Sequence, residues 1–199
     1  AKIDNRKGVI LDHPDVRRML LTMKALTSAV RALCLDAALS LDLSKSNDKE
    51  LSSKENARAS FLIPIAKAFS TDIGCRVADI GIQVHGGMGY VEETGVAQVF
   101  RDVRVTAIYE GTNGIQAIDL IGRKLADSGK AAKGLIDEMK ITISYCSNHE
   151  DQQIREMGDR LSRSLVCLER TLNWMLKQED FNNRLAGATP FLKAFGIIL

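Results

Sequence analysis

The sequence predicts an all-α protein, namely an antiparallel four-helix bundle followed by a helical C-terminal extension. Proline is rare, with 3 in 199 residues, and aromatic residues make up 5% of the chain, so the apolar content is mostly Leu, Ile, Val and Ala. This composition favours helices over a sandwich of sheets. Apolar side chains also recur at three- and four-residue steps, and no segment shows the alternation of a strand.

The first two predicted helices are long. One follows Asp12, which can cap it, and carries an apolar stripe to about Leu41. The other runs from about Ser53 until the glycine-rich turn at 86–89 ends it. The stretch that separates the two helices, residues 44–50, is polar.

Shorter elements follow the glycine-rich turn. A short helix is expected over 95–100, then a charged block at 101–104, and then a loop that contains Glu110. A third long helix is expected to begin near Thr112 and to close at 127–129, where Asp, Ser and Gly stand together.

The last third of the chain differs in character. Apolar positions at 135–143 indicate one helix, a near-heptad stripe from 154 to 175 indicates another, and the segment 185–199 is apolar and rich in small residues. We therefore divide the chain into a bundle, residues 1–125, and a helical extension, residues 126–199.

Charge and cysteine usage argue against several functional classes. The chain has 27 basic and 25 acidic residues and a net charge of +2, which gives no indication of nucleic-acid binding. Its four cysteines and three histidines are scattered without metal-ligand spacing, so we expect no metal and the reduced thiols of a cytoplasmic protein.

No apolar run approaches the roughly 20 residues of a membrane span. Because the chain lacks an initial Met and stops in mid-pattern, we expect a fragment of a longer protein.

The turn Gly86-Gly87-Met88-Gly89 is a candidate ligand site. Glycine permits positive φ and lets backbone N–H groups approach an anion such as a pyrophosphate closely. Gln83, one helical turn earlier, could add a polar contact. The same glycines would serve equally as a helix C-cap and tight turn, and we expect His85 to make a structural hydrogen bond.

Glu110 is a candidate catalytic base, because it stands beside Gly111 in a short break between helices. In a dry site, desolvation raises the pKa of a carboxylate and makes it a stronger base. The alternative is that Glu110 only favours the dipole of the next helix, with Thr112 and Asn113 as caps. The charged block at 101–104 is interpreted as structural ion pairs rather than ligand contacts.

Three motifs in this order and spacing resemble the C-terminal helical domain of the acyl-CoA dehydrogenases, flavoenzymes that oxidise acyl-CoA thioesters to 2-enoyl-CoA. They are Gln-x-x-Gly-Gly-x-Gly-Tyr from Gln83, Arg-Asp-x-Arg from Arg101, and Ile-Tyr-Glu-Gly-Thr-Asn-x-Ile-Gln from Ile108. Residues 12–20 and 117–125 look most like a longer bacterial branch, which includes the 3-methylmercaptopropionyl-CoA dehydrogenases and carries a helical C-terminal extension.

The resemblance implies a role for each motif. Glu110 would be the base that takes the alpha proton, and its backbone N–H would help to polarise the thioester carbonyl. The acyl or CoA channel would be lined by Tyr109 and Gly111. The cofactor would be FAD. Gln83, Gly86 and Gly87 would bind it, commonly the FAD of a neighbouring subunit, and Thr112 would lie near the flavin.

Two departures from the family pattern weaken particular contacts. The family usually carries Arg-x-x-Phe-Gly before the first helix, where this chain has residues 3–8 without that motif, so no residue is assigned to this flavin contact. Gly114 stands where many relatives have Gln or Glu. A flavin-side contact from that side chain is therefore lost.

The resemblance also implies partners and leaves alternatives open. We expect an acyl-CoA substrate, electron-transfer flavoprotein as acceptor, and a homodimer or homotetramer. A fragment that lacks the other domains is expected to bind FAD weakly, if at all. The alternatives are an acyl-CoA oxidase, in which oxygen reaches the reduced flavin, and a non-catalytic helical oligomerisation module that uses the stripe from 154 to 175.

Overall fold

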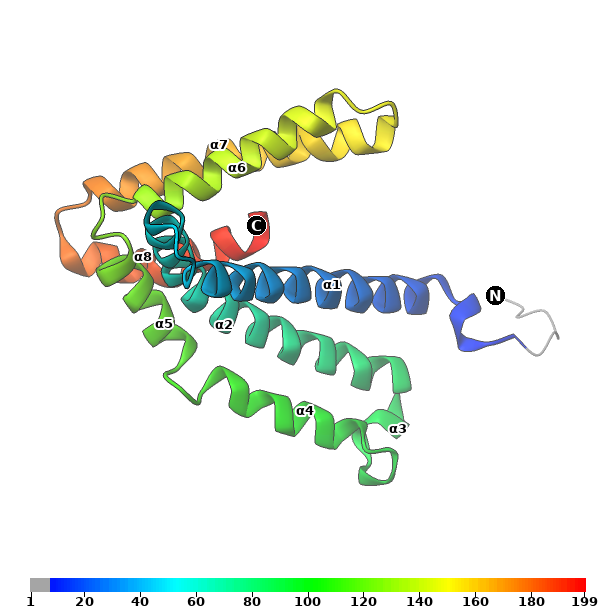
Figure 1. Cartoon of the computed structure of the whole chain (residues 1–199). Helices are drawn as coiled ribbons and strands as arrows, with labels where there is room; N and C mark the ends of the chain where they lie inside the picture. The colour runs from blue at the N-terminus through cyan, green and yellow to red at the C-terminus, as the bar shows by residue number, and fades with distance from the viewer. Residues whose placement is uncertain (1–7) are drawn as a thin grey trace.

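The computed structural model describes residues 8–199, and every regular element in that part of the chain is helical (Figure 1). This confirms the predicted all-α class. None of the helices described combines the length and the apolar character of a membrane span. The elements, in chain order, are η1 (Ile10–Asp12), α1 (Pro14–Leu43), α2 (Lys49–His85), α3 (Gly87–Tyr90), η2 (Glu92–Thr94), α4 (Val96–Arg104), η3 (Val105–Ala107), α5 (Asn113–Asp119), η4 (Leu120–Lys124), α6 (Lys130–Ser147), α7 (Gln152–Lys177) and α8 (Phe181–Ile198).

Helices α1 and α2 form a long hairpin, which in Figure 1 lies between the α6–α7 pair on one side and α4 and α5 on the other. Asp48 caps α2, because its carboxylate accepts hydrogen bonds from the backbone N–H groups of Glu50 at 2.9 Å and Leu51 at 3.2 Å. The predicted cap of α1 is wrong. Asp12 belongs to the 3-10 turn η1, and His13 precedes α1 without a side-chain cap.

The glycine-rich turn ends α2 as predicted. Gly86 follows the helix with φ 60° and ψ −141°, a conformation that is essentially restricted to glycine. The turn then folds back onto α2. At Gly89, a Cβ atom would lie only 2.4 Å from the carbonyl oxygen of Ile82, so this close approach requires glycine.

Helix α4 is longer than predicted and includes the charged block. It runs from Val96 to Arg104, where the sequence had suggested a helix over 95–100 only. The block contains no helix-breaking residue. Its two arginines lie in the last turn, where a positive charge interacts favourably with the helix dipole.

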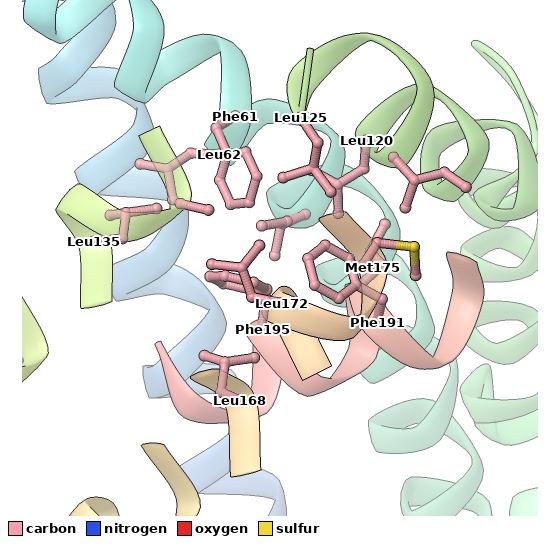
Figure 2. Close-up of a cluster of buried hydrophobic side chains, with 14 of the residues drawn as sticks. Phe61, Leu62, Leu120, Leu125, Leu135, Leu168, Leu172, Met175, Phe191 and Phe195 are labelled. Atoms are coloured by element: carbon pink, nitrogen blue, oxygen red, sulfur yellow. The ribbon is translucent and has the colours of Figure 1, made fainter. Parts of the chain in front are cut away.

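One hydrophobic core joins the first helices to the last ones (Figure 2). Phe61 of α2 and Phe191 and Phe195 of α8 are fully buried, and Phe195 makes edge-to-face contacts with both other rings at centroid distances of 5.1 Å. The predicted stripe of α7 contributes four buried side chains, Leu165, Leu168, Leu172 and Met175. The core therefore includes residues on both sides of position 125.

Helix α8 is seated on α2 and on the turn η4. At Gly196, a Cβ atom would lie 2.4 Å from the ring of Phe69, so the two helices touch closely at this point. The guanidinium of Arg184 donates to the carbonyl oxygen of Ile121 at 2.8 Å, within the π-helical turn η4. The extension thus packs directly against α2 and against α5, the helix that follows the Glu110 loop.

A polar network in the first half of α2 ties α1 and α6 to it. The guanidinium of Arg58 donates to both carboxylate oxygens of Asp36, at 3.0 and 2.9 Å, and to both of Glu138, at 3.2 and 2.8 Å. Burial alone would lower the pKa of Arg58, but its hydrogen bonds to Glu138 and Asp36 outweigh burial and raise that pKa. Arg58 therefore stays charged and holds three helices together.

Candidate active site

Glu110 lies exposed in the loop between η3 and α5. Its backbone φ is 55°, and the left-handed conformation costs a non-glycine residue about 1–2 kcal/mol. Within residues 8–199, the other non-glycine residue with a positive φ is Ser128. Gly111 follows Glu110 with φ 86°. Such strain persists only where the surrounding structure fixes the backbone, and it clusters at functional sites.

Two side chains hold the carbonyl groups of Glu110 and Gly111. The ammonium group of Lys67, on α2, donates to the carbonyl oxygen of Gly111 at 2.7 Å. The side-chain amide of Gln116, on α5, donates to the carbonyl oxygen of Glu110 at 3.1 Å. The loop is therefore held from two different helices.

Asn113 anchors the loop to α2 rather than capping α5. Its amide NH₂ group donates to the carboxylate of Asp72 at 2.7 Å and to the carbonyl oxygen of Ala68 at 3.1 Å, and its amide oxygen accepts from Lys67 at 2.9 Å. The prediction that Asn113 is a cap is wrong. Thr112 is the cap, since its hydroxyl accepts from the backbone N–H of Ile115 at 3.4 Å.

The other residues predicted around Glu110 lie in the same loop. The side chain of Tyr109 is 50% exposed and precedes Glu110 directly. A Cβ atom at Gly111 would contact Gln116 and Ile115 at 3.5 Å, which is ordinary packing, so the positive φ is what selects glycine there. The structure thus brings Tyr109, Glu110, Gly111 and Thr112 together in one exposed turn.

The glycine-rich turn presents an open backbone. Added Cβ atoms at Gly86 and Gly87 would meet no atom within 4 Å, and Gln83 is exposed on the last turn of α2. His85 has the structural role that we predicted, because its Nδ1 atom forms a hydrogen bond with the carbonyl oxygen of Gly81 at 2.8 Å.

The two groups of predicted site residues do not meet in the described chain. The glycine-rich turn precedes α4 and the Glu110 loop follows it, so they lie at opposite ends of this helix (Figure 1). Nine residues of α-helix alone separate them by about 13 Å. Any ligand that bridges both groups must extend along α4, or two ligands must bind separately.

The charged block contributes an ion pair at the glycine-rich end of α4. Arg101 donates two hydrogen bonds to the carboxylate of Glu92, at 2.9 and 2.7 Å, and both side chains are exposed. This bidentate pair fixes the turn η2 against α4 and raises the pKa of Arg101 through the hydrogen bonds to Glu92. The predicted structural role of Arg101 is confirmed.

A hollow of about 820 Å³ lies elsewhere, between the first half of α2 and the start of α6. Its lining includes Lys54, Arg58, Lys130 and Glu138, and none of the predicted site residues. Within residues 8–199, no three His, Cys, Asp or Glu side chains gather as they would around a metal ion, and the four cysteines are free. The candidate site is therefore a surface loop and not a closed pocket of this chain.

The sequence analysis missed the residues that support the loop from α2. Lys67, Thr71 and Asp72 interrupt the apolar pattern of that helix, and all three are partly buried. Polar side chains that face inward need partners, since unpaired buried polar groups are costly. That signal could have indicated a polar contact on α2, although not its partner.

The sequence matches the family described as "Acyl-CoA dehydrogenase, C-terminal domain" over residues 1–126. It is 41% identical over 190 residues to 3-methylmercaptopropionyl-CoA dehydrogenase of Ruegeria pomeroyi, an alignment that covers 94% of this chain and 32% of that protein. It is also 41% identical over 117 residues to butyryl-CoA dehydrogenase of Syntrophomonas wolfei, which covers 58% of this chain and 19% of that protein. These matches confirm the family and branch that the motifs resemble.

A solved structure called "Bd2924 apo-form" shares the fold. It superposes with a TM-score of 0.74 over 97% of this chain and 33% of that one, at 21% sequence identity. The chain therefore spans about a third of the relative from Ruegeria pomeroyi, and a third of this solved structure. Residues 3–7, where the family motif with Arg and Phe would fall, lie outside the described residues.

Proposed function

The chain belongs to the acyl-CoA dehydrogenase family through its C-terminal domain, and from this premise we propose that it supplies the catalytic base of an FAD-dependent acyl-CoA dehydrogenase. The reaction would be the alpha,beta-dehydrogenation of an acyl-CoA thioester to 2-enoyl-CoA. The proposed base is Glu110.

The observation that carries this proposal is the strained conformation of Glu110. A glutamate with φ 55° is unfavourable in a loop, yet Lys67 and Gln116 hold the two carbonyl groups that follow its Cα atom. A merely dipole-compensating glutamate at a helix N-terminus would need no such conformation. The cost of the conformation favours a role that depends on where the side chain points.

The open backbone at Gly86 and Gly87 fits an approaching cofactor. Neither position has an atom within 4 Å of an added Cβ, and Gln83 is exposed beside them. FAD, when bound, would accept the hydride that leaves the beta carbon of the substrate. Gln83, Gly86 and Gly87 would hold this cofactor, and Thr112 would lie near its ring.

Glu110 would perform the proton transfer. Its carboxylate would take the alpha proton, the electrons of that C–H bond would form the second bond of the alkene, and the beta hydrogen would leave with both of its electrons. The backbone N–H of Glu110 would polarise the thioester carbonyl, which makes the alpha proton more acidic. Tyr109 and Gly111 would contact the acyl or CoA part.

Water must be excluded from the carboxylate for this chemistry. Glu110 is exposed on the described chain, so its dry environment would be provided by other parts of the enzyme and by the substrate. We therefore expect the 199-residue chain to bind FAD weakly, if at all, and to have no turnover of its own. The electron-transfer flavoprotein acceptor, the homodimer or homotetramer and the cytoplasmic location belong to the same proposal.

The test is the variant Glu110→Gln in the full-length flavoprotein, with Glu93→Gln as the control at another exposed glutamate. Glutamine keeps the shape of the side chain but cannot accept the proton, so we expect kcat to fall by several orders of magnitude with FAD still bound. The control should keep the wild-type rate. Equal rates in both variants would refute Glu110 as the base. Hydrogen peroxide as a stoichiometric product of the wild type would indicate the oxidase instead.

A further inference from the structure

We propose that Lys67 is a positioning residue for Glu110, acting through the backbone of the loop rather than on the substrate. This inference rests on the proposed function, because it concerns the direction in which the side chain of the proposed base points. Lys67 lies on α2, far from Glu110 in sequence, and its ammonium group donates to the Gly111 carbonyl oxygen at 2.7 Å.

The hydrogen bond from Lys67 acts on the Gly111–Thr112 peptide group, and the one from Gln116 acts on the Glu110–Gly111 peptide group. The Gln116 amide fixes the carbonyl of Glu110 at 3.1 Å, and the Lys67 ammonium fixes the carbonyl of Gly111 at 2.7 Å. The two bonds hold the Glu110–Gly111 and Gly111–Thr112 peptide planes, so the torsions of Gly111 between them have little freedom. On the preceding side, the backbone N–H of Tyr109 donates to the carbonyl oxygen of Val105 at 3.0 Å. The Cα atom of Glu110 therefore lies between two held stretches of backbone, which limits the directions in which its side chain can leave the loop.

The hydrogen bonds from Lys67 and Gln116 oppose relaxation of the strained backbone at Glu110. Without them, the loop would relax toward a conformation with negative φ, which is more favourable for a glutamate. A hydrogen bond from a charged donor is roughly twice as strong as one between neutral groups. Lys67 therefore supplies a strong hydrogen bond to the residue that follows Glu110, and this bond opposes relaxation of the loop.

Asn113 keeps Lys67 itself in place. Its amide oxygen accepts a second hydrogen bond from the Lys67 ammonium at 2.9 Å, while its NH₂ group is bound to Asp72 at 2.7 Å. Asp72 also faces Lys193 of α8 at 3.6 Å. The loop is thus connected through one polar cluster to both α2 and the last helix.

A matched control exists on the same side of the fold. Lys124, in η4, is also partly buried, and its ammonium group donates to the Ser60 hydroxyl of α2 at 2.8 Å. Lys67 and Lys124 therefore make the same kind of contact between helices, but only Lys67 touches the loop. Substitution of either residue by Met removes the charge and retains the packing of the long stem.

The test compares Lys67→Met, Lys67→Arg and Lys124→Met in the full-length flavoprotein. For Lys67→Met we expect a fall in kcat on the order of 10- to 100-fold, with KM for acyl-CoA changed less than about twofold. The isotope effect with alpha-deuterated substrate should rise, because proton removal becomes slower. Lys67→Arg should recover part of the rate, and Lys124→Met should keep kcat and the isotope effect of the wild type.

A second measurement does not depend on activity. Amide hydrogen exchange of Ile108 and Tyr109, whose N–H groups donate to the carbonyl oxygen of Val105 at 2.9 and 3.0 Å, should be faster by about 10-fold in Lys67→Met and unchanged in Lys124→Met. Equal kcat, isotope effect and exchange in the two methionine variants would overturn the positioning role while leaving Glu110 as the base. Wild-type activity in Glu110→Gln would instead overturn the proposed function, and the catalytic role of Lys67 with it.

Discussion

The Glu110 loop and the aromatic core under α8 are held by opposite means. The loop is exposed, contains two successive residues with positive φ, and is fixed by hydrogen bonds from Lys67, Asn113 and Gln116. The core is dry and is held by the contacts of Phe195 with Phe61 and Phe191 (Figure 2).

Because of this difference, the core determines the free energy of folding and the loop determines the geometry of the site. Burial of aromatic side chains is non-directional and large, so the core determines whether the chain folds. Hydrogen bonds contribute less net free energy but specify direction, so the loop contacts determine where Glu110 points. Substitutions in one region should therefore leave the property of the other region largely intact.

The largest effect on stability is expected in the core. Phe195→Ala should lower the free energy of unfolding by about 3–5 kcal/mol, because it removes buried ring contacts and leaves a cavity. Phe181→Ala is the control, since that ring is 55% exposed at the start of α8. Urea denaturation of the chain measures both. Similar losses in the two variants would mean that the core does not carry the stability.

A smaller loss is expected where the loop is anchored. Asn113→Ala should lower the free energy of unfolding by about 1–2 kcal/mol, because Asp72 and Lys67 each lose a partner. The loop should respond more than the fold, with faster amide exchange at Ile108 and Tyr109 and no change around Phe195. Uniformly faster exchange along the chain would contradict the separation of the two regions.

Substitution of the strained glutamate should raise stability slightly. Glu110→Asn should increase the free energy of unfolding by up to about 1 kcal/mol, because asparagine tolerates the left-handed conformation better. Ser128→Asn is the control, at the other non-glycine residue with a positive φ in residues 8–199. Thermal melting should show a similar gain for both, while only Glu110→Asn abolishes turnover of the full-length enzyme. A loss of stability in Glu110→Asn would show that the conformation is not strained.

The smallest effect is expected at the ionic link between the two regions. The pair of Lys193 and Asp72 at 3.6 Å is partly exposed, and such pairs contribute about 0–1 kcal/mol. Lys193→Met should therefore cost about 0.5 kcal/mol or less, measured against Lys177→Met at an exposed site on α7. A loss above about 2 kcal/mol would show that α8 and the loop anchor are coupled more strongly than their contacts indicate.

Local sequence signals predicted the helices well because helix formation depends on neighbours in the chain. The apolar stripe of α7 and the glycine-rich stop after α2 are both of this kind. The cap at Asp12 failed because the chain inserts η1 before α1. Helical spacing also does not determine burial, since Ile115 and Ile118 stand three residues apart in α5 yet are 54% and 42% exposed.

The supports of the site could not be predicted, because they join residues that are distant in sequence. Lys67 meets Gly111, and Asp72 meets Asn113, only after α2 and α5 have packed together. The motif indicated Glu110, but no local pattern indicated that its backbone adopts φ 55°. Conformational strain of this kind follows from tertiary contacts and not from local preference.

The most direct test isolates the removal of the alpha proton from the transfer of hydride. The full-length enzyme is mixed in D₂O with an acyl-CoA analogue in which sulfur replaces the beta methylene, so that no hydride can leave. We predict that the wild type exchanges the alpha hydrogen for deuterium and that the rate of this exchange is several orders of magnitude lower in the Glu110→Gln variant. Exchange at the wild-type rate in Glu110→Gln would contradict the assignment of Glu110 as the base.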